Sequence, residues 1–483
     1  MSETMIHSDS KIMHRRQPVF GRIRHVHMVG IGGIGMSSIA EVLLRRGYEV
    51  SGSDLNESAV TRHLEETGAR VFIGHRAGQE KGACVVVHSS AVDPDKNPET
   101  CAARHARIPV IARSEMLGEL MRMKFGVGIA GTHGKTTTTT MTGHVVNAGA
   151  FDPTVIVGGK VAAFGSNAVS GEGDIILIEA DEYDRTFLRL TPALAVITNI
   201  DADHLDCYAD LDDIKTAFTQ YASSVPFFGA AICCLDDEHV RSILPSIDRK
   251  IITYGTLRQA YIRAENIRQD GLTMHFDLVQ GDRMLGPIVL HAPGRHNVLN
   301  ALAAIAVGLE LDMAFEDIQR GVASFQGVDR RMHEIANACD RLVIDDYAHH
   351  PTEVRATLEA AAGAWPDRRV LAVFQPHLYS RTRQFVTEFG GAFFNADVLV
   401  CMDIYPAREA PEPGVTGQLI ADAARSAGHP AVTFVPDKDQ LVDAVIGLSE
   451  PGDVILTLGA GDIWRQNRAI AQRLIDMQEG ATS

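Results

Sequence analysis

The chain of 483 residues is too long for one ordinary core, so two to four domains are expected, with three as the working number. The formal net charge of −16, from 45 Lys and Arg against 61 Asp and Glu, disfavours nucleic acid as a main partner. No run approaches about 18 uninterrupted apolar residues, so no membrane span is predicted. The seven cysteines form no CxxC pair, which fits a reduced, cytoplasmic environment.

An alternation of strands and helices begins after residues 1–21, which we predict to be a disordered tail. The predicted strands cover residues 25–31, 48–54, 83–91 and 108–114, and the predicted helices cover about 36–46 and 114–122. Such an alternation indicates a parallel sheet buried on both faces. We assign it to a first domain of residues 22–122.

The first strand leads into a loop of the form Gly30-x-Gly32-x-x-Gly35, which is typical of a diphosphate cradle. Asp54 follows Gly35 by 19 residues, at the end of the second strand, where a dinucleotide site places the acid that binds ribose hydroxyls. Taken alone, the loop fits an NAD site, another diphosphate ligand or a purely structural turn.

A second phosphate-type loop, "GTHGKTTT", joins an apolar strand at 125–130 to a helix and opens a central domain of residues 123–328. Lys135 follows a glycine turn and precedes a hydroxyl residue, Thr136, which together suit a triphosphate and Mg²⁺. The strict Walker spacing would need glycine where Ile129 stands, so the loop is a variant.

Acidic side chains gather where two later strands, within 174–182 and 193–206, end. The groups are Glu179, Asp181 and Glu182 on one strand, and Asp201, Asp203, His204 and Asp206 on the other. Ligands of open α/β sheets bind at these strand ends, and Mg²⁺ prefers oxygen ligands. A site for Mg²⁺ is therefore predicted beside the phosphate loop, although His204 alone would be read as structural.

A third α/β block covers residues 329–483, with strands predicted in "LVIDDYAHHP", "RVLAVFQPHLYSRT", "DVLVCMDIYPA" and "DVILTLGAGD". This block also contains histidines and arginines that together could bind a carboxylate, the arginines through two parallel guanidinium hydrogen bonds. They are His349, His350, His377, Arg381 and Arg383. For each histidine taken separately, a structural role is the commoner outcome.

Six motifs, "GTHGKTT", "EADE", "DADHLD", "GRHNVLNA", "RRM" and "DDYAHHP", occur in an order and at spacings that resemble the Mur ligase family, the ATP-dependent amide-bond formers of peptidoglycan synthesis. The resemblance covers nearly the whole chain from about residue 22. It implies a Rossmann-like UDP-binding domain, a central P-loop ATPase domain and a C-terminal Rossmann-like domain. The first glycine loop would then hold the diphosphate of a UDP-sugar, and the second would hold ATP.

Within the family, "GIGGIGMS" with "SSAV", and "QPHLYSRTR", are most similar to members that add L-alanine. The implied reaction is ATP-dependent ligation of L-alanine to the lactyl carboxylate of UDP-N-acetylmuramate through an acyl phosphate. The expected ligands are ATP, UDP-N-acetylmuramate, L-alanine and Mg²⁺, the last as two ions. The protein is expected to be a cytoplasmic monomer or homodimer that binds no nucleic acid. The alternatives are a ligase that recycles murein tripeptide, an NAD-dependent dehydrogenase and a nonenzymatic nucleotide sensor.

The resemblance also implies site residues. For the UDP-sugar these are Gly30, Gly32, Gly33, Gly35, Met36, Ser53, Asp54, Ser89 and Ser90. For ATP they are Gly131, Thr132, His133, Gly134, Lys135, Thr136, Thr137, His296, Asn297, Asn300, Arg331 and Asp346. For L-alanine they are Tyr347, His349, His377 and Arg381. Lys135, Glu179, His204, Arg331 and Asp346 would be catalytic; Thr136 and Glu179 would hold one Mg²⁺, and Glu179 with His204 a second.

Overall fold

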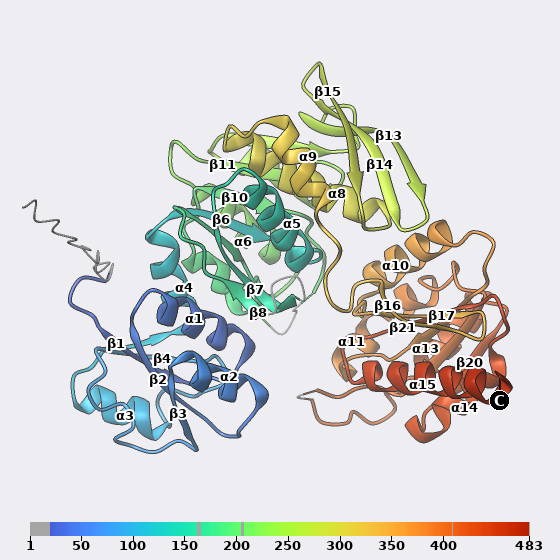
Figure 1. Ribbon diagram of the computed structural model, residues 1–483, viewed down its shortest axis with the longest axis horizontal. Helices are drawn as coiled ribbons and strands as arrows, with labels where there is room; N and C mark the ends of the chain where they lie inside the picture. The colour runs from blue at the N-terminus through green and yellow to red at the C-terminus, as the bar shows by residue number, and fades with distance from the viewer. Residues whose placement is uncertain (1–19, 162–165, 204–206, 408, 483) are drawn as a thin grey trace, which may run out of the picture. The chain divides into compact units, whose positions relative to one another are not determined.

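The computed structural model describes residues 20–161, 166–203, 207–407 and 409–482 (Figure 1). It contains three separate sheets with helices packed on them, which confirms the predicted three-domain α/β class. The chain divides into two compact units, Met1–Lys124 with Asn167–Ser170, and Phe125–Ser166 with Gly171–Ser483. The second unit therefore holds both the central and the C-terminal sheet.

The N-terminal sheet is wholly parallel, as predicted, with the order β3-β2-β1-β4-β5. Its strands are β1 (His25–Val29), β2 (Glu49–Asp54), β3 (Arg70–Ile73), β4 (Val85–His88) and β5 (Val110–Ala112). Its helices are α1 (Ile34–Arg45), α2 (Ala59–Thr67), α3 (Pro98–His105) and α4 (Arg113–Arg122). Every residue of β1 is buried, as expected of a strand covered on both faces.

Most of the predicted tail, residues 1–19, lies outside the described residues. Phe20, near the end of that predicted tail, packs against Tyr48, with ring centroids 5.4 Å apart. The Phe20 backbone N–H also donates to the Tyr48 hydroxyl at 3.0 Å. Phe20, two residues before the predicted start of the first domain, therefore contacts that domain.

The central sheet runs in the order β15-β14-β13-β12-β11-β10-β6-β9-β7. Its strands are β6 (Phe125–Ala130), β7 (Thr154–Val161), β9 (Ile175–Glu179), β10 (Leu194–Ile197), β11 (Ala230–Cys234), β12 (Ile251–Gly255), β13 (Ile262–Asp270), β14 (Thr273–Gln280) and β15 (Arg283–Leu290), and β8 covers Ser166–Val169. Its helices are α5 (Lys135–Ala148), α6 (Leu211–Ser223), α7 (Glu238–Ile243), α8 (Arg295–Glu310) and α9 (Phe315–Ala323), with 3₁₀ turns at Tyr183–Arg189 and Leu244–Ser246. Helices α5 and α8 pack closely, because a Cβ on Gly308 of α8 would lie 3.0 Å from Val145 of α5.

The antiparallel strands β13, β14 and β15 were not predicted. Their buried and half-buried residues alternate along β13 and β14, which is the pattern of a sheet with one face toward the core. The strands predicted for the central domain were those that alternate with helices or carry the site motifs. Three strands joined by short turns need no crossover helix, so they interrupt that alternation.

The C-terminal sheet has the order β16-β17-β21-β18-β19-β20, and only β16 at its edge is antiparallel. Its strands are β16 (His333–Ala338), β17 (Arg341–Asp346), β18 (Val370–Phe374), β19 (Val398–Met402), β20 (Val432–Val435) and β21 (Val454–Leu458). Its helices are α10 (Pro351–Ala364), α11 (Tyr379–Gln384), α12 (Val386–Gly390), α13 (Gln418–Ser426), α14 (Lys438–Leu448) and α15 (Ile463–Thr482).

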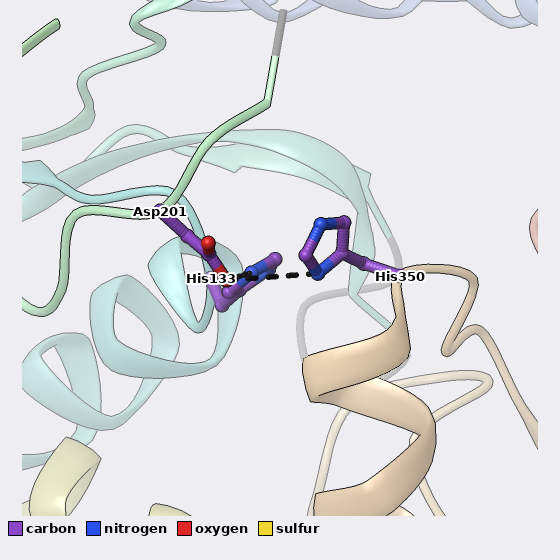
Figure 2. Close-up of side chains that lie close together, drawn as sticks. All are labelled: His133, Asp201 and His350. Carbon is purple, nitrogen blue, oxygen red and sulfur yellow. Dashed lines mark hydrogen bonds and ion pairs between the residues drawn. The ribbon is translucent and has the colours of Figure 1, made fainter. Parts of the chain in front are cut away.

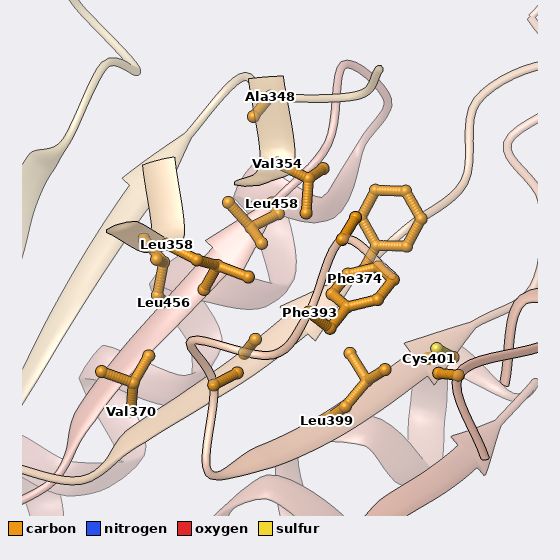
Figure 3. Packing of buried hydrophobic residues seen from close by; sticks show 14 of the residues in the cluster. Ala348, Val354, Leu358, Val370, Phe374, Phe393, Leu399, Cys401, Leu456 and Leu458 are labelled. Carbon is orange, nitrogen blue, oxygen red and sulfur yellow. The ribbon is translucent and has the colours of Figure 1, made fainter. Parts of the chain in front are cut away.

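The C-terminal core fixes α10 against this sheet (Figure 3). Val354 and Leu358, one helical turn apart, are fully buried beside Leu456 and Leu458 of β21. Because α10 cannot shift without disturbing this packing, the residues at its N-terminus are held at the carboxyl end of β17. Across the described part of the chain, no helix combines the length and apolar character that a membrane span requires.

Candidate functional site

The phosphate loop lies between β6 and α5, with its backbone fastened to the end of β10. Thr132 N–H donates to the Asn199 carbonyl at 3.1 Å, and His133 N–H donates to the Asn199 side-chain oxygen at 2.8 Å. Gly131 has φ +141°, and a Cβ there would lie 1.9 Å from the Thr198 hydroxyl, so only glycine fits. The loop is thus held in one shape, with the N-terminus of α5 behind it.

Lys135 begins α5 and turns back over the loop. Its Nζ donates to the carbonyls of Gly131 and Thr132 at 2.7 and 3.1 Å and pairs with Glu182 at 2.8 Å. Burial opposes the charge, but the carboxylates of Glu182 and Asp181 raise the pKa of Lys135 above its ordinary value. The lysine is therefore a fixed cation at the mouth of the loop.

Thr136 and Glu179 meet beside this lysine. The Thr136 hydroxyl donates to both carboxylate oxygens of Glu179 at 3.0 Å, and Gly158 N–H donates to the same carboxylate at 2.7 Å. Burial raises the pKa of Glu179 above its usual range. A hydroxyl and a half-buried carboxylate side by side are the hard oxygen donors that suit Mg²⁺. His204, predicted to hold a second ion, lies outside the described residues, as does Asp206.

A cavity of about 260 Å³ opens next to the phosphate loop, within the second unit. Among the residues predicted to bind ATP, it is lined by His133, Gly134, His296, Asn300 and Arg331. Burial, with a contribution from Arg331, lowers the pKa of His296 to about 4, so this imidazole is neutral. The cavity is therefore lined by residues of the central domain and by Arg331 and α10 of the C-terminal domain.

A smaller cavity of about 120 Å³ is lined by three more of the residues predicted to bind ATP, Thr137, Asn297 and Asp346, again with His296 and Arg331. Asp346 ends β17, is buried, and accepts from the Met332 and Ala348 backbone N–H groups, each at 2.8 Å. Burial raises its pKa. Asp346 therefore holds the chain on either side of the β17 end in place.

Glu353 was not predicted as a site residue, yet it lines the larger cavity. Its carboxylate lies 3.2 Å from His133 Nδ1, which links α10 to the phosphate loop. A capping box orients it, because Glu353 stands third in α10 behind the N-cap residue His350 and Pro351. That helix-start pattern in "HHPTEV" was the available sequence signal.

His133 lies between two carboxylates. Its other ring nitrogen, Nε2, is 3.3 Å from Asp201. Burial disfavours the imidazolium, but the hydrogen bonds to Asp201 and Glu353 outweigh it and raise the pKa of His133 to about 9. His133 is thus cationic at neutral pH in this arrangement.

All four residues predicted to bind the amino acid line a third cavity, of about 920 Å³; they are Tyr347, His349, His377 and Arg381. Arg381 Nη2 contacts both carboxylate oxygens of Asp203, at 2.8 and 2.9 Å, while its buried Nε has no hydrogen-bond partner among the described residues. Burial lowers the pKa of His349 to about 3, so it is neutral. The cavity therefore combines a cation that retains a free donor with a neutral imidazole.

Residues outside the prediction complete this third cavity. Tyr405 stacks on His377 with ring centroids 5.8 Å apart, and Ser380 donates to Glu409. Tyr405 and Glu409 follow β19 in a segment that no motif marked. The contacts of Tyr405 with His377 and of Glu409 with Ser380 depend on tertiary folding, so the local sequence did not predict them.

The first glycine loop lies in the other unit, at the carboxyl end of β1, the central strand of the N-terminal sheet. Gly32 N–H donates to Asp54 at 2.9 Å, and a Cβ on Gly30 would lie 3.0 Å from Ser89. Gly33 and Ser90 are exposed, whereas Met36 and Ser53 are fully buried. The Ser53 hydroxyl donates to buried Glu99 at 2.7 Å, so Met36 and Ser53 shape the loop from beneath.

Arg113, at the start of α4, is the cation that the sequence analysis missed beside this loop. A Cβ on Gly35 would lie only 2.6 Å from its Nη1, so the guanidinium rests against the N-terminus of α1. A helix N-terminus and a guanidinium both attract anions. Arg113 lies about eighty residues after the loop in the sequence, so no local pattern predicted their contact.

Comparison with known proteins agrees with this geometry. Family models match residues 25–125 (Mur ligase family, catalytic domain), 129–308 (Mur ligase middle domain) and 330–461 (Mur ligase, glutamate ligase domain). A UDP-N-acetylmuramate--L-alanine ligase of Salinibacter ruber is 62% identical over 95% of this chain and 97% of its own.

Solved structures share the fold. The UDP-N-acetylmuramate-alanine ligase of Thermotoga maritima has a TM-score of 0.76 and 30% identity, covering 94% of this chain and all of that one. A murein peptide ligase of Psychrobacter arcticus has a TM-score of 0.64 at 24% identity, covering 94% of this chain and 98% of its own, which is a likeness of fold alone. The chain belongs to the Mur ligase family.

Proposed function

We propose that this chain is an ATP-dependent ligase that joins L-alanine to the lactyl carboxylate of UDP-N-acetylmuramate, in the synthesis of peptidoglycan precursors. The observation that carries the proposal is the near-full-length identity to the Salinibacter ruber ligase, whose name gives both substrates. The cavities of the second unit are consistent with it, because a phosphate loop and a carboxylate-binding cation lie in one compact unit. We place the reaction in the cytoplasm.

The chemistry begins from a carboxylate, which is a poor electrophile. An oxygen of the lactyl carboxylate attacks the γ-phosphorus of ATP, ADP leaves, and an acyl phosphate forms. The amine of L-alanine then attacks the acyl carbon, inorganic phosphate leaves, and the amine loses a proton. The residues must therefore bring two anions together and exclude water from the acyl phosphate.

Lys135 and the phosphate loop supply the positive charge for the first step. The ammonium is fixed by Glu182 and by two loop carbonyls, so it needs no reorganisation when negative charge develops on the transferred group. Thr136 and Glu179 would hold Mg²⁺ through oxygen atoms. Mg²⁺, when bound, would neutralise charge on the phosphates.

The two smaller cavities suit the nucleoside of ATP. We assign neutral His296 with Asn297 and Asn300, at the start of α8, to the surroundings of the adenine. Asn300 donates to Asn297 at 3.2 Å, so the two amides form one rigid polar edge. Arg331 and Asp346 would close the nucleotide site from the C-terminal sheet.

The third cavity would hold L-alanine. Arg381 would bind its carboxylate, and Tyr347, His349 and His377 would surround the rest. His349 Nδ1 lies 2.9 Å from the Tyr347 carbonyl, so the ring donates from Nδ1 and keeps a lone pair on Nε2. Because this imidazole is neutral, it can accept a hydrogen bond from the attacking amine.

The decisive assay measures phosphate release from ATP with UDP-N-acetylmuramate present, with and without L-alanine. We expect release to depend on L-alanine and to yield the ligated product in equal amount. The tripeptide L-Ala-γ-D-Glu-meso-diaminopimelate is the control substrate, because a cavity of about 920 Å³ has room for more than alanine. Faster turnover with the tripeptide than with L-alanine would identify a recycling ligase instead.

Gly32→Val should raise the Michaelis constant for UDP-N-acetylmuramate by about tenfold or more. A Cβ at this position would lie 2.9 Å from both Asp54 and Thr61, so the valine must displace the carboxylate that holds the loop. The crowding comes from the protein itself, in addition to any block to the ligand that a glycine loop of this kind avoids.

Calorimetry with UDP-N-acetylmuramate, an ATP analogue and NAD in turn checks the Gly32 prediction. Affinity for the ATP analogue should change little, since the second phosphate loop lies in the other unit. Gly447→Val is the matched control, because nothing lies within 4 Å of a Cβ there. Loss of NAD binding with unchanged binding of the UDP-sugar would instead support a dinucleotide site.

A further inference from the structure

Three side chains from distant segments converge between the phosphate loop and α10 (Figure 2). His133 comes from the phosphate loop, Asp201 follows β10, and His350 is the N-cap residue of α10. Asp201 Oδ2 is 3.3 Å from His133 Nε2 and 3.7 Å from His350 Nδ1. All three candidate ligand atoms lie within 4.8 Å of one another.

The His350 ring presents an unprotonated nitrogen, Nδ1, to this cluster. His350 Nδ1 accepts from the Thr352 backbone N–H at 3.4 Å, which places the proton of the neutral ring on Nε2. Burial lowers the pKa of His350 to about 4, so the ring is neutral at physiological pH. The Nδ1 lone pair accepts the long contact from Thr352 N–H, and Asp201 Oδ2 lies 3.7 Å from the same nitrogen. A cation bound at Nδ1 would replace that hydrogen bond and would also be held by the Asp201 carboxylate.

The hydrogen-bond partners of His133 and Asp201 are of the kind that orient metal ligands. His133 presents Nε2 to the cluster while its Nδ1 lies 3.2 Å from Glu353, and a histidine ligand commonly donates its second ring N–H to a carboxylate in this way. Asp201 accepts from the Thr352 hydroxyl at 2.8 Å and from Ala202 N–H at 2.8 Å. Two of the three candidate ligands are thus oriented by further hydrogen bonds.

Spacing and donor type select the metal. Tetrahedral ligands about 2.0–2.1 Å from Zn²⁺ lie about 3.4 Å from one another, close to the two distances that Asp201 makes. Two imidazoles and one carboxylate suit Zn²⁺, whereas Mg²⁺ prefers oxygen ligands. We propose that His133, Asp201 and His350 form a Zn²⁺ site that joins the phosphate loop to the start of α10.

This site is separate from the one assigned to Mg²⁺, because it shares neither Thr136 nor Glu179. Three protein ligands leave a fourth position for water. Bound Zn²⁺ would replace the ion pair between His133 and Asp201 and hold the phosphate loop against the C-terminal sheet.

The test is calorimetric titration of the nucleotide-free protein with Zn²⁺ in the presence of excess Mg²⁺. We expect one ion per chain, and a dissociation constant at least about tenfold higher in both His350→Asn and Asp201→Asn. Asparagine is a favoured N-cap residue, so His350→Asn removes the imidazole without removing the cap of α10. His291→Asn, which removes an exposed histidine outside the cluster, should leave the affinity unchanged.

Co²⁺ bound to the unmodified protein gives a readout that does not depend on any variant folding. Nitrogen and oxygen ligands in a tetrahedral site predict intense visible absorption without a thiolate charge-transfer band. A thiolate band, a weak octahedral spectrum, or Zn²⁺ affinity unchanged in both cluster variants would overturn the proposal.

Discussion

Replacing Lys135 by alanine is expected to abolish ligation, lowering kcat by about 100-fold or more. The ammonium lies at the mouth of the phosphate loop, already oriented by Glu182 and the Gly131 and Thr132 carbonyls. Removing it leaves the transferring phosphoryl group without its fixed cation and leaves Glu182 buried without its ion pair. Both effects oppose the approach of a carboxylate to the triphosphate.

Binding of UDP-N-acetylmuramate to Lys135→Ala should remain nearly intact by calorimetry, because its proposed loop lies in the other unit. Lys250→Ala is the control, since that lysine is exposed and pairs with Glu310 at the surface. A Lys135→Ala enzyme that kept more than about a tenth of the normal turnover would show that Lys135 is not the cation of the first step.

The fold was predictable wherever strands and helices alternate. β6 is a continuous apolar segment, and β1 is buried throughout although it contains His25 and His27. Parallel pairing follows from the helices between such strands. The β13–β15 strands were missed because a half-buried antiparallel strand gives a weaker signal, and its neighbours need no helix.

The candidate site was predictable only where chemistry is local. Lys135 and Thr136 follow from the loop itself, and the carboxylate of Glu179 follows from its strand end. Glu353 contacts His133, and Tyr405 stacks on His377. Tertiary packing brings these residues together, so the spacing of residues along the chain does not predict their contacts. The Arg381–Asp203 pair likewise joins two residues that are far apart in the chain.

That pair determines what a conservative change at Arg381 should do. Its Nη2 holds both oxygens of Asp203, and its Nε remains buried without a hydrogen-bond partner among the described residues. Its Nη1 makes only a 3.5 Å contact with His377 Nδ1, so an incoming carboxylate can use the donors of Nη1, which Asp203 does not occupy. Lysine would keep the charge opposite Asp203, so the fold should survive, but it offers a point charge in place of the planar fork.

Arg381→Lys should accordingly raise the Michaelis constant for L-alanine by about tenfold or more, which corresponds to roughly 1.4 kcal/mol or more of lost binding. The constants for ATP and UDP-N-acetylmuramate should change little, because neither ligand is assigned to this cavity. Steady-state kinetics with each substrate varied in turn separates the three. Arg425→Lys, a surface arginine paired with Asp422, serves as the control. An unchanged constant for L-alanine would mean that its carboxylate is bound elsewhere and that Arg381 serves chiefly to pair with Asp203 across the two sheets.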